Sequence, residues 1–581
     1  MRKILIANRG EIAVRIIRTA REMGLATVAV YSEIDRDALH ARMADEAYLL
    51  GPAPPSQSYL NVEKLLETAK TAGADAVHPG YGFLAENAGF ARAVIAAGLT
   101  WIGPHPDAID AMGDKVRARQ AMVKAGVPVV PGGTEAIESP EQAQEAAQRY
   151  GLPLALKASG GGGGKGLKVA RTLEDLPSAL ATAQREALAY FKNGTIYAER
   201  YLDNPKHVEL QILADKHGTV LHVGERDCSL QRRHQKLWEE APATIPDAMR
   251  KGMREAGVRA AQAIGYDSVG TIECLVSGNE FYFLEMNTRI QVEHTVSEMI
   301  SGLDLIREQI RVAAGEPLGY AQDAVEFRGH AIEGRVNAED PSNNFSPAPG
   351  TVVAYREPAG LGIRVDSAAY PGFTVTPDYD SMIAKLVVWA PDREQAIARL
   401  RRAIDEYTIV GVPTTLPLLR ALCDNANVRD ASYGTATLEA FVASGYSQAP
   451  YQDTETGAAD AQDDTVRVEV NGKLFRVRLV DVPGGAQMAQ RSNGKKAAPR
   501  TAHKKRAVGP AGNDVPSPMH GVVVEISVKE GDAVEQGRVV AVIEAMKMMN
   551  EIRAHKAGTV SAVRVKTGET VEANSPLVTI E

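Results

Sequence analysis

Lys547 stands between two methionines, in Ala545-Met546-Lys547-Met548, at the junction of an internal repeat. The segment 523–544 aligns without gaps with 560–581 at an offset of 37, and 8 of its 22 positions are identical. Two similar strand–turn–strand halves predict a small quasi-symmetric all-β domain with this lysine on an exposed turn. A lysine beside a methionine is ordinarily a surface residue, but the repeat and the junction mark this one for a chemical role.

A run of five glycines, Gly160–Gly164, follows a short apolar strand. Such a run lets backbone N–H groups approach phosphate oxygens, and Lys157 and Lys115 could neutralise a polyphosphate. It is not a Walker A loop, because no Gly-Lys-Ser/Thr ends it: Gly166 follows Lys165, and Leu167 comes next. Alone, the run is equally typical of a flexible linker. With the two lysines it predicts a mobile lid over a nucleotide.

Polar residues occupy every second position from Glu285 to Glu293. In an extended chain alternate side chains point the same way, so they are expected to line one polar face. Beside the apolar strand 280–286 such a row is costly unless it meets ligands, although an exposed amphipathic edge remains the alternative. Carboxylate and amide oxygens suit Mg²⁺ or Mn²⁺. The row consists of Glu285, Asn287, Arg289, Gln291 and Glu293.

Glu273 on the preceding strand, 271–276, is a further candidate ligand whose position depends on the hairpin register. A two-residue loop would place Ser277 opposite Glu280 and turn Glu273 and Glu285 to opposite faces. A three-residue loop would place the two carboxylates opposite each other, and so would a bulge in the shorter register. Shared metal binding therefore requires the longer loop or the bulge.

His294 and Cys228 lie among these polar residues without an evident chemical role. Alternation sends His294 to the face opposite Glu293, so we expect it to pack or to make a structural hydrogen bond. Nothing near Cys228 marks it as a nucleophile. The three cysteines lie far apart and give neither a disulfide framework nor a zinc pattern, which suits a reducing cytosol.

The composition is that of an ordinary globular chain of several domains. The 581 residues include 44% apolar and 24% charged side chains with a net charge of −8, which excludes wholesale disorder and global nucleic-acid binding. No apolar stretch is long enough to span a membrane, and the N-terminal apolar run is too short for a signal peptide. We therefore expect a cytoplasmic protein without nucleic-acid or membrane partners.

Local patterns predict how the chain is organised. Strand 3–7, helix 12–23 and strand 27–31 predict an α/β layer with parallel strands. Between 465 and 482, two alternating runs meet at Asn471-Gly472, a strong hairpin signal. The basic segment 484–513 lacks aromatic residues, which favours a solvated tether over a nucleic-acid patch. The expected segments are 1–115, 116–330 with a lid at about 130–202, 331–446, a connector at 447–483, the tether at 484–513 and a carrier-like domain at 514–581.

Six strings, two of them described above, complete the pattern: Ala7-Asn-Arg-Gly-Glu-Ile-Ala, His78-Pro-Gly-Tyr-Gly-Phe-Leu-Ala-Glu-Asn87, Lys157–Gly166, Glu225-Arg-Asp-Cys-Ser-Leu-Gln-Arg-Arg-His-Gln-Lys236, Glu285–His294 and Arg335-Val-Asn-Ala-Glu-Asp-Pro341. Together they closely resemble biotin carboxylase, an ATP-grasp enzyme, followed by a biotinyl carrier domain. Methionines around the carrier lysine, and Ser517-Pro518-Met519 upstream, fit a biotinyl rather than a lipoyl carrier. The resemblance covers most of the chain. It implies an α/β and α+β fold: an N-terminal α/β domain, an ATP-grasp domain with its lid, a β-rich C-terminal domain and a small all-β carrier.

The resemblance also implies roles for single residues. Biotin is expected in amide linkage on Lys547, and two Mg²⁺ or Mn²⁺ ions on Glu273, Glu285 and Asn287. ATP is expected to contact Lys115, Lys157, Gly163, Gly164, Glu199, Arg200, Tyr201, Leu202, His207, Gln231 and His234. Bicarbonate and biotin are expected at Gln291 and Val292 and at the catalytic residues Lys236, Arg289, Glu293 and Arg335.

The implied reaction has two steps. Glu293 takes the proton of bicarbonate, which attacks the γ-phosphate of ATP and forms carboxyphosphate. In the closed site this yields CO₂ and phosphate; phosphate deprotonates the ureido nitrogen of biotin, and Arg335 stabilises the resulting enolate.

The whole chain resembles the α subunit of an acetyl-CoA or propionyl-CoA carboxylase. A biotin-protein ligase, a homo-oligomer within a larger complex and a separate carboxyltransferase β subunit are expected as partners, the last because no carboxyltransferase sequence follows the carrier. The acyl-CoA itself is not fixed, and a split pyruvate carboxylase is the nearest alternative. Of other classes, an ATP-grasp ligase with a non-biotinylated tail would fail a streptavidin blot. A basic-linker RNA-binding protein would give a salt-dependent gel shift.

Overall fold

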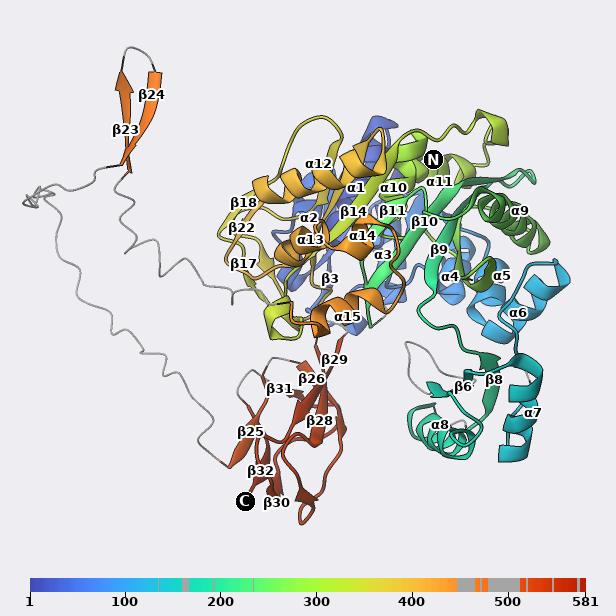
Figure 1. The fold of residues 1–581 in the computed structure, drawn as a ribbon. Helices are drawn as coiled ribbons and strands as arrows, with labels where there is room; N and C mark the ends of the chain where they lie inside the picture. The colour runs from blue at the N-terminus through green and yellow to red at the C-terminus, as the bar shows by residue number, and fades with distance from the viewer. Residues whose placement is uncertain are drawn as a thin grey trace, which may run out of the picture. The chain divides into compact units, whose positions relative to one another are not determined.

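A computed structural model divides the chain into two compact units, residues 1–450 and 451–581 (Figure 1). It describes residues 1–133, 135–158, 167–191, 194–233, 235–446, 465–470, 473–478, 513–518, 521–545, 548–571 and 575–581. Side chains are described for all of these except 115–116, 189–191, 465–478, 545, 548–549 and 570. The predictions for the glycine run with Gly163 and Gly164, for His234, for Lys547, for the side chain of Lys115 and for most of the tether lie outside the described residues.

The first part of unit 1 is a parallel sheet in the order β3-β2-β1-β4-β5, as the opening pattern predicts. Ile4 and Ile6 of β1 pack against Ile12 and Ile16 of α1. Asn87 caps α4 by accepting a hydrogen bond from Phe90 N at 2.8 Å. The elements are β1 (Lys3–Ile6), α1 (Gly10–Glu22), β2 (Ala26–Ser32), α2 (Leu39–Met43), β3 (Glu46–Gly51), α3 (Val62–Thr71), β4 (Ala76–His78), α4 (Ala88–Ala96), β5 (Thr100–Trp101) and α5 (Pro106–Gly113).

A small sheet with two helices occupies the segment for which a lid is expected. Its order is β7-β6-β8, and Leu154 and Leu156 of β6 pack with Leu180 of α8. A capping box of Ser139 and Gln142 starts α7, as this residue pair predicts. α6 (Lys115–Lys124) precedes this segment, whose elements are α7 (Pro140–Tyr150), β6 (Leu154–Ala158), β7 (Leu167–Ala170), α8 (Leu176–Phe191) and β8 (Ile196–Arg200).

The central feature is an eight-stranded sheet in the order β13-β12-β9-β10-β11-β14-β21-β19. β11 pairs with β14, so the sheet is continuous across residue 330, between the second and third expected segments. Its strands are β9 (Lys206–Ala214), β10 (Val220–Arg232), β11 (Gln235–Ala241), β12 (Val269–Ser277), β13 (Glu280–Asn287), β14 (His330–Asn337), β19 (Ile363–Ser367) and β21 (Met382–Ala390).

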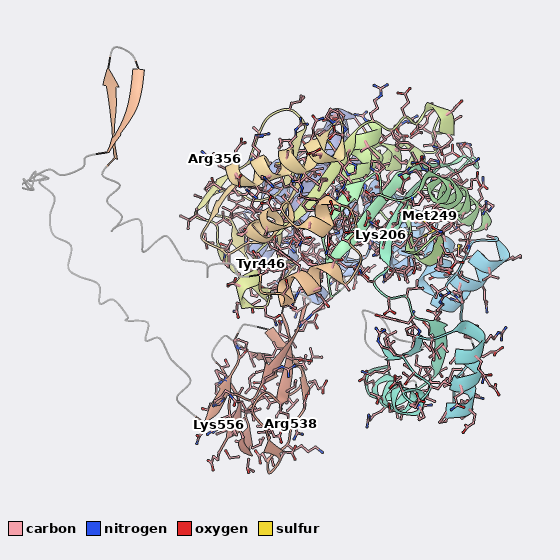
Figure 2. All side chains as sticks on the ribbon, in the orientation of Figure 1. Lys206, Met249, Arg356, Tyr446, Arg538 and Lys556 are labelled. Carbon is pink, nitrogen blue, oxygen red and sulfur yellow. The ribbon has the colours of Figure 1, made fainter. Side chains whose placement is uncertain are left out.

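The two faces of this sheet differ in character. Val208 and Leu210 of β9 belong to the apolar core that also holds Met249 of α9 (Asp247–Ala263). Lys206 marks the start of β9, and Met249 shows where α9 lies (Figure 2). Three of the alternate residues of β9, His207, Glu209 and Gln211, are buried and polar, whereas the last of the series, Leu213, is apolar. Because successive side chains of a strand point to opposite faces, polar groups collect on the face away from α9.

Helices and short strands complete unit 1. α10 (His294–Ser301) and α11 (Leu305–Ala313) follow β13, and α12 (Arg393–Glu406) follows β21. The remaining elements are β15 (Glu339–Asp340), β16 (Ser346–Pro347), β17 (Gly350–Thr351), β18 (Ala354–Arg356), β20 (Thr374–Val375), β22 (Thr408–Val410), α13 (Leu416–Leu422), α14 (Ala426–Arg429) and α15 (Thr437–Ala443). In the described part of the chain no helix is long and apolar enough to cross a membrane.

Unit 2 contains the predicted hairpin and the predicted all-β domain. β23 (Thr465–Val470) pairs with β24 (Lys473–Arg478), and Asn471-Gly472 joins them in the sequence. The all-β domain has two sheets, β25-β32-β30-β27 and β29-β28-β26-β31. Its strands are β25 (Asp514–Pro516), β26 (Gly521–Ile526), β27 (Ala533–Val534), β28 (Val539–Ala545), β29 (Met548–Arg553), β30 (Gly558–Val563), β31 (Thr570–Val571) and β32 (Pro576–Ile580).

The sequence repeat is repeated in the strand pairing of this domain. Gly521 of β26 pairs with Val571 of β31, and Gly558 of β30 pairs with Val534 of β27. The repeat offset of 37 converts one pair into the other. Each half thus exchanges its short strand with the other half, which confirms the quasi-symmetric arrangement.

Candidate active site and carrier domain

The register of the β12–β13 hairpin decides whether two acidic side chains share one face. Ser277 pairs with Glu280, so the shorter of the two predicted loops is present. A bulge beside Glu273 then shifts the register, leaving Leu284 out of the pairing and Glu273 opposite Glu285. The bulge restores the alignment that shared metal binding requires.

Oxygen ligands therefore gather where these two strands meet. Glu273 and Glu285 are opposite each other, and Asn287 Nδ2 donates to Glu273 Oε1 at 2.8 Å. Two carboxylates and an amide fit a hard divalent cation such as Mg²⁺. Ligand atoms of His207, Glu209 and Glu273 also lie within 4.8 Å of one another, a grouping that includes only one of the three predicted ligands.

The extended row expected from Glu285 to Glu293 is wrong beyond Asn287. β13 ends at Asn287, and residues 288–293 form a loop that leads into α10. Glu86 accepts hydrogen bonds from Thr288 N at 3.2 Å and from Arg289 Nε at 2.9 Å, so the chain there bonds a side chain instead of a neighbouring strand. Strict alternation consequently fails, although the loop still carries later residues to the same cluster.

Lys236 of β11 is the centre of that cluster. Its ammonium group contacts Glu209 and donates to Glu293 Oε1 at 2.6 Å and to Glu273 Oε1 at 3.2 Å. Its side chain is 11% exposed, so three carboxylates surround one cation with little water. Hydrogen bonds between ionised partners are the strong ones in proteins, and these connect β9, β11, β12 and the 288–293 loop.

Arg335 of β14 is the second cation at Glu293. Its Nη2 donates to Glu293 Oε2 at 2.9 Å, while its Nε donates to Glu239 Oε1 at 2.6 Å. Burial by itself would raise the pKa of Glu293, but Lys236 and Arg335 hold it well below its usual range. Glu293 is therefore an ionised carboxylate at neutral pH, a state that can accept a proton.

The predictions missed Arg226 and Glu209, whose side chains bond to each other and to other residues of the cluster. Arg226 has no exposed surface and donates to Glu209 Oε2 at 2.9 Å and to Gln291 Oε1 at 2.6 Å. It also donates to Gln211, Thr271 and Ser297. A signal for Glu209 was present in the strand 206–214, where polar residues alternate with apolar ones over its first part.

The residues expected to contact ATP fall into two groups. His207 Nε2 donates to Glu273 Oε2 at 2.9 Å and its Nδ1 lies 3.3 Å from Gln231 Nε2, which places both residues in the cluster. Lys157 and Glu199 lie on neighbouring lid strands and form an ion pair. The rest of the predicted interdomain segment follows Glu199 directly: Arg200, Tyr201 and Leu202.

His294 and Cys228 have structural surroundings, as expected. His294 is fully buried, and its Nδ1 donates to the carbonyl of Gln291 at 2.8 Å. Burial raises the pKa of the Cys228 thiol well above its usual value, which disfavours the thiolate that a nucleophile needs.

The carrier-like domain brings the two repeats together at one connection. β28 and β29 pair up to Ala545 opposite Met548, and only Met546 and Lys547 stand between them in the sequence. Lys547 itself lies outside the described residues. The strand pairing shows that its position joins two adjacent antiparallel strands, as the repeat predicts.

Four family models match the chain in succession. They are the biotin carboxylase N-terminal domain at 1–109, the carbamoyl-phosphate synthase L chain ATP-binding domain at 114–321, the biotin carboxylase C-terminal domain at 333–440 and the biotin-requiring enzyme domain at 513–580.

Curated relatives agree with these matches. The chain is 44% identical over 598 residues to the biotin-dependent acyl-coenzyme A carboxylase alpha3 subunit of Mycobacterium leprae, covering 100% of this chain and 98% of that protein. It is 52% identical over 444 residues to biotin carboxylase 1 of Bacillus subtilis, covering 76% and 99%. It is 50% identical over 428 residues to a pyruvate carboxylase subunit of Methanothermobacter thermautotrophicus, covering 74% and 87%.

Solved structures resemble the first unit. A biotin carboxylase β,γ-ATP complex from Campylobacter jejuni is 47% identical with a TM-score of 0.72, covering 76% of this chain and 98% of that one. The biotin carboxylase domain dimer of the Hydrogenobacter thermophilus 2-oxoglutarate carboxylase, with MgADP, ADP and bicarbonate, is 49% identical with a TM-score of 0.71, covering 76% and 97%.

Proposed function

Because this chain belongs to the biotin carboxylase family and carries a biotin-requiring domain of its own, we propose that it is the α subunit of an acyl-CoA carboxylase. It carboxylates the biotin of its carrier domain with ATP and bicarbonate. A separate carboxyltransferase β subunit then transfers the carboxyl group to acetyl-CoA or propionyl-CoA. A biotin-protein ligase attaches the biotin at Lys547, and the carboxylase part forms a homo-oligomer within the complex.

One observation carries the choice of acyl-CoA over other acceptors. Similarity to the acyl-CoA carboxylase alpha3 subunit extends over 100% of this chain, hairpin connector and carrier included. Similarity to the pyruvate carboxylase subunit covers 74% of it. Since the carboxylase part is alike in both relatives, the support for an acyl-CoA acceptor comes from the remaining part. A split pyruvate carboxylase is the second candidate, supported by the 50% identity of the shared part.

We assign a role in the reaction to each of three charged residues of the cluster. Glu293 accepts the proton of bicarbonate, and a bicarbonate oxygen then attacks the γ-phosphorus of ATP. Lys236 and Arg335 stabilise the negative charge of the reacting groups. Lys236 and Arg335 keep the pKa of Glu293 low before substrates bind. Bound anions compete for both cations, so Glu293 becomes a stronger base when bicarbonate arrives.

Other residues bind and orient the substrates bicarbonate and ATP. Arg289, held by Glu86 and Asn287, presents its guanidinium for bicarbonate, and Gln291 and Val292 complete that subsite. Lys157 and Lys115 hold the phosphates of ATP, with Gly163 and Gly164 of the lid. The adenosine and the rest of the nucleotide contact His207, Gln231, His234 and the segment from Glu199 through Arg200 and Tyr201 to Leu202.

The metal and biotin fit the residues that are present. Glu273, Glu285 and Asn287 would hold Mg²⁺ or Mn²⁺, which neutralises charge on the ATP phosphates when bound. Biotin on Lys547 supplies a ureido nitrogen that carries the carboxyl group between two sites. Arg335 and Lys236 are the groups of this chain placed to stabilise the anionic forms of the reactants.

A reconstitution experiment tests the proposal. The biotinylated chain is co-purified with its carboxyltransferase partner and incubated with ATP, [¹⁴C]bicarbonate and acetyl-CoA, propionyl-CoA, a longer acyl-CoA or pyruvate. Acid-stable label in an acyl-CoA is the expected result. Label in pyruvate alone would overturn the acyl-CoA assignment and support the split pyruvate carboxylase.

A further inference from the structure

Two side chains hold consecutive carbonyl groups of the loop that precedes Glu293. His294 Nδ1 donates to the carbonyl of Gln291 at 2.8 Å. Lys385 Nζ, from β21, donates to the carbonyl of Val292 at 3.0 Å. The peptide planes between 291 and 292 and between 292 and 293 are therefore both fixed from outside the loop.

Both donors are buried deeply enough to need an explanation. Lys385 has no exposed surface, and its Nζ lies 3.3 Å from Glu11 Oε2 and 3.8 Å from Asp366 Oδ2. His294 is also fully buried, and burial lowers its pKa to about 3, so it is a neutral ring with a hydrogen on Nδ1. Burying a lysine is costly unless its charge is paired and its hydrogens are used. Here one of those hydrogens goes to a loop carbonyl.

Fixing these carbonyls also fixes two N–H groups. In a trans peptide the N–H points opposite to the C=O of the same plane. The N–H of Val292 therefore points away from His294, and the N–H of Glu293 points away from Lys385. Among the hydrogen bonds of the described residues, neither N–H is a donor, although Glu293 is only 2% exposed. Buried backbone donors without partners are rare, so the N–H of Glu293 indicates a ligand, and the N–H of the half-buried Val292 lies directly beside it in the chain.

We propose that Lys385 and His294 are positioning residues for bicarbonate: by holding the carbonyls of Val292 and Gln291, they aim the N–H groups of Val292 and Glu293 at the oxyanion. The inference rests on the proposed function, because it assigns these donors to the bicarbonate of that reaction. Two adjacent N–H groups form a concave anion site. Glu293, on the same turn, then receives the proton from the anion that its own N–H binds.

The main variant is Lys385→Met, which keeps the length of the side chain and removes its donor. ATP hydrolysis is measured with free biotin and varied bicarbonate on the full-length chain. We expect KM for bicarbonate to rise about tenfold, the effect of losing one well-placed hydrogen bond, while KM for ATP stays within about twofold. The matched control is Lys3→Met, because Lys3 Nζ also donates to a carbonyl, that of Ala72 at 2.7 Å, and to Glu46 at 2.6 Å. It should leave KM for bicarbonate unchanged.

Loss of Lys385 also leaves Glu11 buried without its cation, and a second variant separates this effect. Lys385→Met combined with Glu11→Gln should recover thermal stability but keep the raised KM for bicarbonate. Recovery of that KM in the double variant would overturn the proposal, since the stranded carboxylate would then be the cause.

His294 provides an independent test that does not alter a charge. His294→Leu removes the Nδ1 donor, whereas His294→Asn places an amide N–H near the same point. We expect Leu to raise KM for bicarbonate about tenfold and Asn to restore it to within about threefold. Equal KM values for wild type and His294→Leu, or a parallel rise in KM for ATP, would refute the positioning role.

The readout also separates this inference from the proposed function. Wild-type chain that hydrolyses ATP with bicarbonate and free biotin, yet carboxylates no acyl-CoA with its partner, would contradict the acyl-CoA assignment and leave the positioning test intact. Wild-type chain without bicarbonate-dependent hydrolysis would overturn both.

Discussion

Replacing Glu293 with glutamine tests the proposed base where the structure allows the cost to be worked out. The carboxylate accepts hydrogen bonds from Lys236 at 2.6 Å and Arg335 at 2.9 Å. Bonds to charged groups contribute about 1.5–3 kcal/mol each, and the amide oxygen of glutamine can still accept one of the two. With one bond lost, we expect Glu293→Gln to lower the free energy of unfolding by about 1.5–3 kcal/mol.

The fold should survive this loss because neither cation is stranded. Lys236 keeps Glu209 and Glu273, and Arg335 keeps Glu239. Activity should suffer far more than stability. An amide cannot take the proton of bicarbonate, and losing a general base costs about 10²–10⁴-fold in rate. The assay is bicarbonate- and biotin-dependent ATP hydrolysis at saturating ATP, with mass spectrometry confirming that biotin is still attached.

Glu240→Gln is the matched control for this variant. Glu240 is fully buried in β11 of the same sheet and accepts hydrogen bonds from Arg393 at 2.9 and 3.0 Å and from His330 at 3.0 Å. It should lose comparable stability and keep its rate within about threefold. A Glu293→Gln enzyme that retains a tenth or more of the wild-type rate would refute the base assignment. A Glu240→Gln enzyme that is equally slow would show that any buried charge loss in this sheet has the same effect.

Three further outcomes follow from other parts of the molecule. Lys547→Arg keeps the charge but cannot form the amide, so mass spectrometry should show no biotin; acyl-CoA carboxylation should disappear while free-biotin carboxylation persists, and a biotinylated variant would contradict the carrier assignment. Burial would raise the pKa of Glu240, but His330 and Arg393 lower it to about 2. In denaturant titrations, the stability advantage of wild type over Glu240→Gln should therefore be full above about pH 5 and shrink as pH falls from about 4.5 toward 2. A difference in stability that widens on acidification would be inconsistent with this. Deleting Leu284, the bulged residue, leaves Glu273 opposite Glu285 without a bulge, so the Mg²⁺ concentration for half-maximal activity should change less than about threefold, whereas Glu285→Gln should raise it at least about tenfold.

Features that depend on neighbouring residues could be read from the sequence. The opening strand–helix–strand pattern, the Asn471-Gly472 hairpin and the repeat around Lys547 all appear in the structure with bounds that differ by a few residues. Each depends on local periodicity or turn chemistry, which a short window contains. The repeat reaches further because two copies of one pattern must fold alike.

Features that depend on distant residues could not be predicted from the sequence. The chain leaves the extended conformation after Asn287 because Glu86, about two hundred positions earlier, bonds Thr288 and Arg289. No window around Glu293 contains that information. Arg226 was missed for the same reason: its partners come from β9, β12, the 288–293 loop and α10, which only the fold brings together.

The polar face of the eight-stranded sheet explains why the candidate site lies where it does. Apolar residues of β9 and β12 face α9, so the alternate residues lie on the other side, where five of them are buried and polar: His207, Glu209, Gln211, Thr271 and Glu273. Buried carboxylates persist only when cations reach them. Lys236 and Arg335 come from two neighbouring strands of the same sheet, and Glu293 enters from a loop to meet both. The buried carboxylates of β9 and β12 are therefore paired with cations from other strands of the same sheet. The bulge at Leu284 is what brings the edge strand β13 into the same register, with Glu285 on the charged face.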